Sequence, residues 1–149
     1  MLVYRITLAK YADQMISSGN EGRWNSRGVK VIYAAGSRSL ACLENIVHRS
    51  GIGFDQLFKA MLIEIPAALP VTEIDLKSLP QGWNNLFSAK ITRGMGDEWY
   101  RKQETAVLKV PSAIIPAESN YIFNTLHPSF KRVKLLGAEP FLFDTRLTA

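Results

Sequence analysis

The feature that most constrains the fold of this chain is a series of short apolar runs separated by Gly, Pro and Ser. Runs of about four to eight residues that are rich in Val, Ile, Leu and Tyr are typical of β-strands. Proline ends or interrupts several of these runs, because a residue without an N–H cannot continue a ladder of backbone hydrogen bonds. The pattern predicts strands over residues 2–7, 29–35, 60–65, 105–110 and 131–136, and a last short strand over residues 141–143.

Helical periodicity is clearest over residues 37–49, where Leu40, Leu43 and Val47 recur at spacings of three and four. That spacing places the three side chains on one face of a helix, which is expected to pack on the core. A serine at the start of the stretch can cap the free amides of the first turn. Gly51 follows the stretch and is predicted to end it.

Three other segments are less regular. Residues 9–18 are predicted to be helical, and so is a short stretch from Asp55 onward, with Leu57 and Phe58 turned inward. Residues 81–96 are predicted to form a mobile loop because they contain two closely spaced glycines. Several strands, a few helices and no regular alternation between them predict an α+β fold with a mixed or antiparallel sheet and flanking helices.

The composition excludes several classes of protein. A chain of 149 residues fits one domain, 1–149, with a core large enough to need no metal or disulfide. The single Cys42 excludes a disulfide framework and a cysteine-rich zinc site. No run of about 18 apolar residues is present, so no membrane span is expected. The N-terminus has no basic region followed by a long apolar run, so no secretory signal is expected, and a cytoplasmic location is predicted. The net charge of +5 is scattered, without a basic run typical of a nucleic-acid arm.

The segment from Gly22 to Gly28 combines residue types that suit a nucleotide. Glycine lets the backbone approach a ligand closely, and the planar fork of Arg23 matches phosphate oxygens. Trp24 offers a flat face for a ring, and Asn25 adds a polar group. The glycine spacing is neither a dinucleotide fingerprint nor a P-loop. The alternative is a surface turn in which Trp24 fills the core and the arginines are solvated.

Tyr33 and Glu44 are further candidates. Tyr33 lies in a predicted strand, where it is either a core aromatic or a stacking platform with a polar end. Glu44 lies at the edge of the apolar helical stripe, where a carboxylate is uncommon unless it is paired or used. Burial would raise its pKa and a neighbouring arginine would oppose that rise. His48 lies on the same side of the helix, and its spacing from the carboxylates does not indicate a metal site.

Three polar residues follow the apolar run 107–116, namely Ser119, Asn120 and Asn124. They fit either a helix cap with a turn or a set of hydrogen-bonding groups at the rim of a cleft. No catalytic triad can be argued from sequence position, and Cys42 is expected to be a small apolar residue of a helix rather than a reactive thiolate.

Together these segments resemble the RES domain family, named for Arg, Glu and Ser. Tyr4-Arg5, Gly22-Arg-Trp-Asn25 with Gly28, and Tyr33-Ala-Ala carry the first part of the resemblance. It continues in order to the end of the chain through Ser39-Leu-Ala-Cys-Leu-Glu44, Leu79-Pro-Gln-Gly-Trp83, Gly96-Asp-Glu-Trp99, Leu108-Lys-Val-Pro-Ser112, Pro116 to Asn124, His127-Pro-Ser-Phe130 and Phe143-Asp-Thr-Arg-Leu147. Each motif is weak alone, and the ordered set is specific.

The resemblance implies the toxin of a bacterial toxin–antitoxin pair that degrades NAD⁺, by hydrolysis or phosphorolysis. The implied fold is similar to ADP-ribosyltransferase toxins, with a split mixed sheet that binds NAD⁺ as substrate and needs neither a metal nor a separate cofactor. The implied partner is an Xre-type antitoxin whose helix-turn-helix domain binds DNA and which covers the cleft; the toxin itself is expected to contact no nucleic acid. The implied catalytic residues are Arg23, Tyr33, Glu44 and Ser119, and the implied NAD⁺-binding residues are Arg5, Gly22, Arg23, Trp24, Asn25, Tyr33, Ser119 and Asn120.

The corresponding chemical hypothesis is cleavage of the bond between nicotinamide and ribose through an oxocarbenium-like transition state, with Glu44 stabilising the developing cation. Tyr33 would stack on the nicotinamide ring, Arg23 and Arg5 would bind the pyrophosphate, and Ser119 with Asn120 would orient ribose or amide groups. Two alternatives stay open. One is an ADP-ribosyltransferase that modifies a protein, and the other is a basic module without enzymatic activity that binds nucleic acid.

Overall fold

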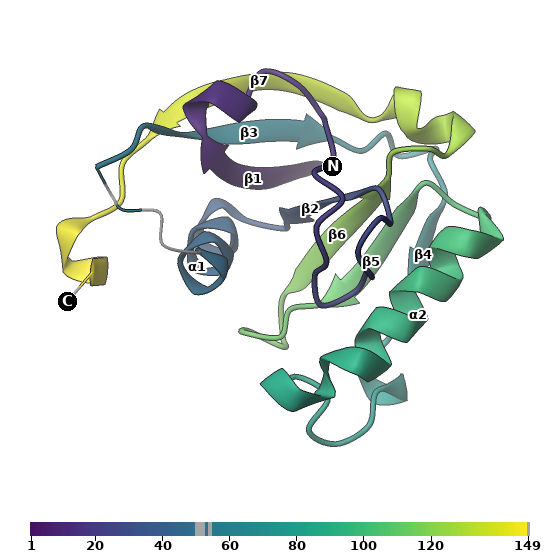
Figure 1. Cartoon of the computed structure of the whole chain (residues 1–149). Coiled ribbons are helices and arrows are strands. Elements are labelled where there is room, and N and C mark those ends of the chain that lie inside the picture. The colour runs from purple at the N-terminus through teal and green to yellow at the C-terminus, as the bar shows by residue number, and fades with distance from the viewer. Residues whose placement is uncertain (50–52, 54, 149) are drawn as a thin grey trace.

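A seven-stranded mixed sheet with the order β4-β5-β6-β2-β1-β3-β7 forms the centre of the computed structural model, which describes residues 1–49, 53 and 55–148 (Figure 1). Neighbouring strands are antiparallel except β4 and β5, which are parallel. The strands are β1 (Leu2–Leu8), β2 (Val31–Ala35), β3 (Phe58–Glu64), β4 (Val71–Glu73), β5 (Val107–Pro111), β6 (Ser119–Asn124) and β7 (Lys134–Phe141). The predicted α+β class with a mixed sheet is confirmed.

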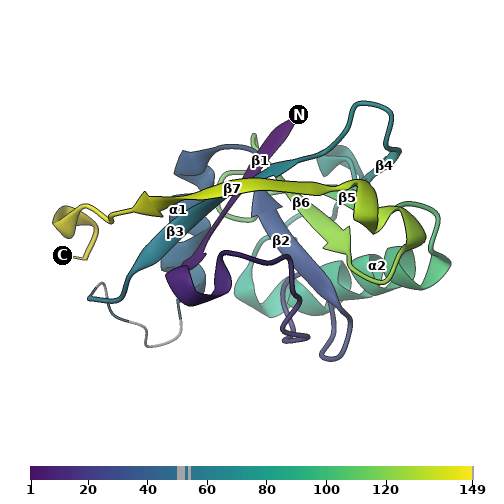
Figure 2. The ribbon, with the colours of Figure 1, turned by 90° about the horizontal axis from the view of Figure 1, so that it is seen from above.

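The sheet is split between β1 and β2. These two strands are paired only at Tyr4 and Ala35, whereas β1 and β3 are paired along their whole length from Leu2 to Leu8. As a consequence, the strands of the two halves run in different directions, and Figure 2 shows β2 and β6 crossing the direction of β7. The split divides the sheet into a half made of β1, β3 and β7 and a half made of β4, β5, β6 and β2.

Two α-helices lie on the same face of the sheet within the described residues, α1 (Arg38–His48) and α2 (Ala89–Lys102). Ser37 caps α1 by accepting a hydrogen bond from the Leu40 amide at 3.1 Å, as the serine at its start predicted. Leu40 packs against β1, β2 and β3, whereas Trp99 of α2 packs against β5 and β6. Five short 3₁₀ turns connect the elements: η1 (Ala9–Tyr11), η2 (Leu76–Ser78), η3 (Leu86–Ser88), η4 (Pro128–Arg132) and η5 (Thr145–Thr148).

The apolar stripe of α1 differs from the prediction. Leu40 is 1% exposed, but Leu43 is 36% and Val47 is 59% exposed, so only the start of the stripe reaches the core. The helix ends at His48, with Arg49 as the C-cap, and Gly51 lies outside the described residues. The helix is therefore turned so that Glu44, at the edge of the stripe, faces the sheet.

Several other predictions are wrong, and each has a physical reason. The helix predicted over residues 9–18 is only the 3₁₀ turn Ala9–Tyr11 followed by irregular backbone. The helix predicted from Asp55 is a turn leading into β3, where Phe58 pairs with the edge strand β7 and Leu57 is exposed. Residues 141–143 form no separate strand, because β7 continues through Phe141.

The most consequential error concerns the predicted mobile loop 81–96, part of which is helix α2. Glycine lowers helix stability, yet both Gly94 and Gly96 lie inside α2. Gly96 is required by packing, because a Cβ atom there would lie 1.7 Å from the backbone oxygen of Trp24. A tertiary contact therefore outweighs the local preference. Strand β6 was also not predicted, since its polar ends resemble a cap and a turn.

Candidate functional site

The carboxylate of Glu44 is the centre of a hydrogen-bonded group where α1 meets the ends of β5 and β6. Oε1 accepts hydrogen bonds from the Ser112 hydroxyl at 2.9 Å and from the Asn120 amide at 2.7 Å. Oε2 lies 3.1 Å from Nε2 of His48, one helical turn further along α1. The Glu44 side chain is 20% exposed, so a carboxylate that is mostly buried still opens to solvent.

The surroundings of Glu44 keep it ionised. Burial by itself would raise the pKa of its carboxyl group, because a charged group loses hydration. The hydrogen bonds from His48, Asn120 and Ser112 outweigh burial and hold the pKa of Glu44 below its ordinary value. At neutral pH this group is therefore a fixed anion, suited to accept a hydrogen bond or to stabilise a nearby positive charge.

Ser112 was not among the predicted site residues, although it ends the quoted run Leu108 to Ser112. It is fully buried directly after β5, and its oxygen accepts hydrogen bonds from the amides of Ile114 and Ile115, each at 3.1 Å. These two donors leave the hydroxyl hydrogen to point at Glu44. A serine that follows Pro111 at the end of a predicted core strand was the available signal, but its contact with α1 spans 68 positions of sequence.

Asn120 and Ser119 are separated by the geometry of β6. Side chains alternate between the two faces of a strand, so these neighbours project from opposite faces. Asn120 shares its face with Ile122 and reaches Glu44, whereas Ser119 lies on the face of Tyr121 and Phe123. Within the described residues no hydrogen bond joins Ser119 to Glu44, and the hydroxyl that does reach Glu44 belongs to Ser112. The catalytic role of Ser119 stays a prediction that this arrangement does not support.

The turn from Gly22 to Asn25 closes on itself and on Tyr33. Gly22 and Asn25 exchange backbone hydrogen bonds at 3.0 and 3.4 Å. The Tyr33 hydroxyl donates to Oδ1 of Asn25 and accepts from the Trp24 amide at 3.1 Å. Trp24 is 3% exposed and contacts Trp83, so of the two alternatives for this residue the structure shows the one in which Trp24 fills the core.

Tyr33 is held too firmly to act as an acid or a base. Burial raises the pKa of its hydroxyl group above the ordinary value, and the hydrogen bond from Trp24 only partly opposes this rise. Both hydrogen-bonding directions of the hydroxyl are occupied within the turn. What Tyr33 can offer a ligand is its ring, on the same face of the sheet as Asn120, because Tyr33 and Ile122 are paired across β2 and β6.

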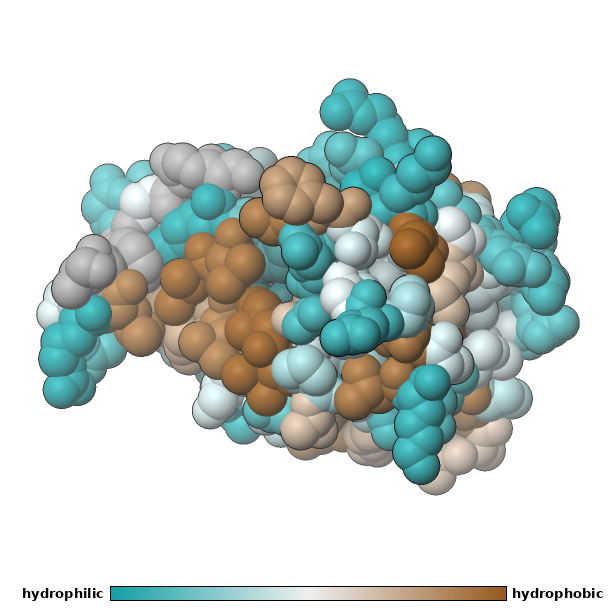
Figure 3. Space-filling model, turned by 90° about the horizontal axis from the view of Figure 1, so that it is seen from below, coloured by the Kyte–Doolittle hydropathy of each residue, from teal (hydrophilic) through white to brown (hydrophobic). Residues whose placement is uncertain are grey.

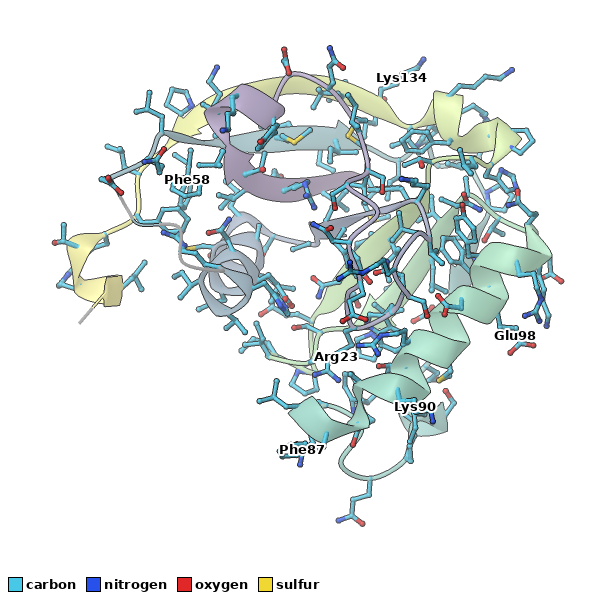
Figure 4. All side chains as sticks on the ribbon, in the orientation of Figure 1. Arg23, Phe58, Phe87, Lys90, Glu98 and Lys134 are labelled. Carbon is cyan, nitrogen blue, oxygen red and sulfur yellow. The ribbon has the colours of Figure 1, made fainter. Side chains whose placement is uncertain are left out.

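Arg23 projects into the space between α1 and α2 (Figure 4). Its guanidinium donates to the carbonyl of Trp83 at 3.1 Å and, less closely, to the carbonyls of Asn84 and Asn85. Burial lowers the pKa of Arg23, and attraction to Glu44 opposes that change. The charges of Arg23 and Glu44 therefore interact.

Arg5 occupies the split of the sheet. Its guanidinium donates to the carbonyl of Tyr33 at 2.9 Å, across the opening between β1 and β2. Burial lowers the pKa of Arg5, and no carboxylate lies within ion-pair distance of it among the described residues. The guanidinium thus brings positive charge to the backbone of the strand that carries Tyr33.

Helix α2 fixes the Gly22–Asn25 turn through residues that were not among the predicted site residues, although Asp97 lies in the quoted motif Gly96 to Trp99. The Thr92 hydroxyl donates to the carbonyl of Arg23 at 2.7 Å, and Nε of Arg93 donates to the carbonyl of Gly22 at 3.3 Å. The Asp97 carboxylate accepts from the amide of Ser26 at 2.8 Å and from its hydroxyl. The turn is therefore attached to α2 along its length.

The rim of the site on α1 is apolar. Exposed Leu43 and Val47 flank Glu44 and His48 on the helix surface. Figure 3 shows apolar side chains gathered over α1 on this lower face, beside polar ones. Among the described residues, no group of three or more His, Cys, Asp or Glu is placed to hold a metal ion, and no helix is long and apolar enough to cross a membrane.

The fold and the site define an α+β domain with a split mixed sheet and a carboxylate-centred site beside the split. The same fold occurs in a chain of the M. tuberculosis MbcT–MbcA toxin–antitoxin complex, with a TM-score of 0.78, 15% identity, and coverage of 95% of this chain and 84% of that one. The sequence profile of the RES domain matches residues 2–144. The chain belongs to the RES domain family.

Two relatives are similar over nearly their whole length. A Sphingobium sp. (strain YBL2) protein named Prs ADP-ribosylating toxin is 37% identical over 141 residues, which cover 91% of this chain and 88% of that protein. A Photorhabdus laumondii protein named Toxin Res is 35% identical over 155 residues, with coverage of 99% and 97%. The family resemblance predicted from the motifs is thereby confirmed.

Proposed function

We propose that this chain is the toxin of a toxin–antitoxin pair and that it cleaves the bond between nicotinamide and ribose in NAD⁺. Membership of the RES domain family and the names of the relatives support the toxin. The observation that carries the chemistry is the ionised, partly exposed Glu44, whose Oε1 accepts from Ser112 and Asn120 while Oε2 has only His48 as a partner among the described residues.

In the proposed reaction the bond from the ribose C1′ to the nicotinamide nitrogen breaks, and its electron pair leaves with nicotinamide. The sugar becomes an oxocarbenium-like cation, as in glycoside hydrolysis. The Glu44 carboxylate stabilises this cation and accepts a hydrogen bond from a ribose hydroxyl through Oε2. Water or phosphate then adds to C1′ and loses a proton to solvent. Because nicotinamide is a good leaving group, no strong general acid is needed.

The other predicted residues take roles that fit their surroundings. Arg23 exchanges its weak hydrogen bonds to carbonyl groups for the pyrophosphate, with Arg5 adding charge from the split of the sheet. The ring of Tyr33 packs on nicotinamide. Gly22, Trp24 and Asn25 act by shaping the turn, since the side chains of Trp24 and Asn25 are buried. Ser112, together with Asn120, takes the role that was predicted for Ser119, which is to orient ribose or amide groups.

Incubation of the purified chain with NAD⁺, followed by identification of the products by mass spectrometry, tests the proposal. Release of nicotinamide is expected from the wild type, with ADP-ribose as the second product in water or its 1″-phosphate in phosphate buffer. Glu44→Gln, which removes the charge at nearly constant shape, is expected to lower the rate at least 1,000-fold. A folded wild type that leaves NAD⁺ intact in both buffers, or Glu44→Gln with wild-type turnover, refutes the mechanism.

A second candidate is transfer of ADP-ribose to a protein. It is favoured by the name of the Sphingobium relative, Prs ADP-ribosylating toxin, which is 37% identical to this chain. The two activities share the cleaved bond and differ in the acceptor. NAD⁺ labelled in its adenine, incubated with a bacterial lysate, separates them, because transfer moves the label into a protein band whereas hydrolysis leaves it in free ADP-ribose.

The proposed partner is an Xre-type antitoxin that covers the Glu44 site. The apolar rim formed by Leu43 and Val47 on α1 is a surface of the kind that such a cover would bury. In this arrangement DNA binding belongs to the antitoxin. Co-expression with the neighbouring reading frame tests it, since a bound partner is expected to abolish nicotinamide release.

A further inference from the structure

The proposed reaction leaves one contact of Glu44 without a role, the contact with His48. The imidazole lies one helical turn after Glu44, and its Nε2 is 3.1 Å from Oε2. Oε1 already accepts two hydrogen bonds, from Ser112 and Asn120, so Oε2 is the oxygen with an open acceptor direction. Among the described residues, His48 is the partner of this oxygen, so the imidazole lies beside the place where the proposed substrate must bind.

We propose that His48 is a positioning residue for Glu44: its neutral imidazole orients Oε2 toward the ribose, and its protonated form turns the reaction off by neutralising the carboxylate. The inference rests on the proposed function, because it assigns to His48 a control over the same cleavage. His48 touches neither substrate nor the reacting bond and acts through Glu44.

The two charge states of His48 have opposite effects on the chemistry. A neutral imidazole that donates from Nε2 holds Oε2 in place and leaves its negative charge intact. An imidazolium at the same distance forms an ion pair with Glu44 and places a positive charge beside the cation that the reaction must create. Histidine is the side chain whose ordinary change of charge lies between about pH 5 and 8, which includes the range of cellular pH.

The exposure of the pair allows the switch to operate. The His48 side chain is 64% exposed and Glu44 is 20% exposed, so protons reach the imidazole while the carboxylate stays in its pocket of donors. An exposed pair of this spacing contributes little to stability. Replacing His48 therefore changes the electrostatics of the site without threatening the fold.

Other charged groups near Glu44 do not change charge in this range. From the Gly22–Asn25 turn, Arg23 acts on Glu44 and stays protonated, and Ser112 and Asn120 are neutral donors. At the C-cap of α1, Arg49 stacks on the rings of Phe58 and Phe143.

Cys42, also on α1, keeps its proton, because burial raises the pKa of its thiol. The pKa of Glu44 is itself held below the ordinary value of a carboxyl group. Apart from Glu44 itself, the imidazole of His48 is thus the group in this contact that can gain or lose a charge.

The test is the rate of nicotinamide release from NAD⁺ between pH 5.5 and 8.5, for the wild type, His48→Gln and His48→Ala. The wild-type rate is expected to rise about tenfold across about pH 5 to 8. His48→Ala is expected to lack this rise and to be several-fold slower at pH 8, because Oε2 loses its donor. His48→Gln keeps an amide donor without a titratable proton, so it recovers most of the rate and also lacks the rise.

The chain provides a matched control, because it has only one other histidine. His127 lies at the start of η4, where its ring bonds the carbonyl of Gln103 at 2.9 Å and the amide of Ser129 at 3.0 Å. His127→Gln is expected to keep the wild-type pH profile. If His48→Gln also keeps the rise, or if both His48 variants lower the rate equally at every pH, the inference is overturned.

A measurement without turnover separates this inference from the proposed function. In the wild type, the carboxylate carbon of Glu44 is expected to shift in nuclear magnetic resonance spectra as the pH passes through the imidazole range. In His48→Gln this response is expected to vanish. A wild type that releases no nicotinamide at any pH overturns the proposed function and this inference together. An active wild type without the spectral response overturns the inference alone.

Discussion

The two halves of the sheet bury different kinds of side chain. The half made of β1, β3 and β7 buries mainly apolar ones in the part of the chain that the structure describes, such as Met61 and Ile63, and Arg5 at the split is the exception. The fully buried polar side chains among the described residues belong to the other half with its turn and helix, and they are Asn25, Thr92, Ser112 and Asn124. Since a buried polar group is costly unless it is hydrogen-bonded, such a concentration marks where positions are fixed for binding rather than for stability.

This comparison predicts that substitutions in the two halves have different consequences. In the half with the polar groups, substitutions that keep the fold are expected to change turnover or substrate affinity. In the apolar half they are expected to change the free energy of unfolding alone.

The largest expected effect is that of Gly96→Ala, which attacks the junction between α2 and the turn. The new Cβ would lie 1.7 Å from the Trp24 backbone oxygen, and neither backbone can move without breaking the bond that Thr92 donates to Arg23 and the bond that Asp97 accepts from Ser26. A loss of about 3 kcal/mol or more in the free energy of unfolding is expected, together with loss of NAD⁺ cleavage. Urea denaturation measures the first and nicotinamide release the second.

Gly94→Ala is the matched control within the same helix. Nothing lies within 4 Å of a Cβ built there, so the substitution is expected to stabilise the protein by about 0.5 kcal/mol through helix propensity. Equal destabilisation by the two substitutions would show that α2 and the turn are not joined as described.

Gly96 also shows why only part of the fold could be predicted from the sequence. Strands β1, β2, β3 and β5 could be predicted because apolar runs and prolines are local signals. Helix α2 could not, because the reason for its glycine is the backbone of Trp24, which lies far away in the sequence. Strand β6 was missed for a related reason, since Asn120 makes a contact with Glu44 that only the folded chain brings together.

The residues of the candidate site were likewise predictable only in part. Glu44 was identifiable as a carboxylate at the edge of an apolar stripe, and family motifs supplied Arg23, Tyr33 and Asn120. Ser112 was passed over in favour of Ser119, because strand register decides which serine faces Glu44 and that register becomes known only from the structure.

The next effect in size is that of Ser112→Ala, which removes a donor to Glu44 from the polar half. We expect the rate of nicotinamide release to fall about 10- to 100-fold, since the carboxylate loses a fixed hydrogen bond and the amides of Ile114 and Ile115 lose their acceptor. Ser119→Ala, from the opposite face of β6, is expected to keep the rate within about twofold. Steady-state kinetics of the two variants side by side decide which serine serves the site, and the reverse order of effects would restore Ser119.

A smaller effect is expected from Asp97→Asn, which weakens the attachment of the turn to α2. The charged acceptor for the amide and hydroxyl of Ser26 becomes a neutral one, so the Arg23 turn is held less firmly. The KM for NAD⁺ is expected to rise about fivefold with little change in kcat. The neighbouring Glu98→Gln breaks only an exposed ion pair with Lys102 and is expected to alter neither constant. A fall in kcat without a change in KM would place Asp97 in catalysis rather than in binding.

The smallest expected effect comes from the apolar half. Ile63 is fully buried in β3, packed in the cluster that includes Met61 and Phe123, and has no bond to any residue around Glu44. Ile63→Val removes one methyl group and is expected to lower the free energy of unfolding by about 1 kcal/mol. Below the unfolding transition, kcat and KM are expected to stay at the wild-type values, because the cluster around Ile63 lies on the face of the sheet opposite to the one from which Asn120 reaches Glu44. If kcat falls while the fold is intact, the two halves are coupled, and the apolar half shapes the site as well as supporting it.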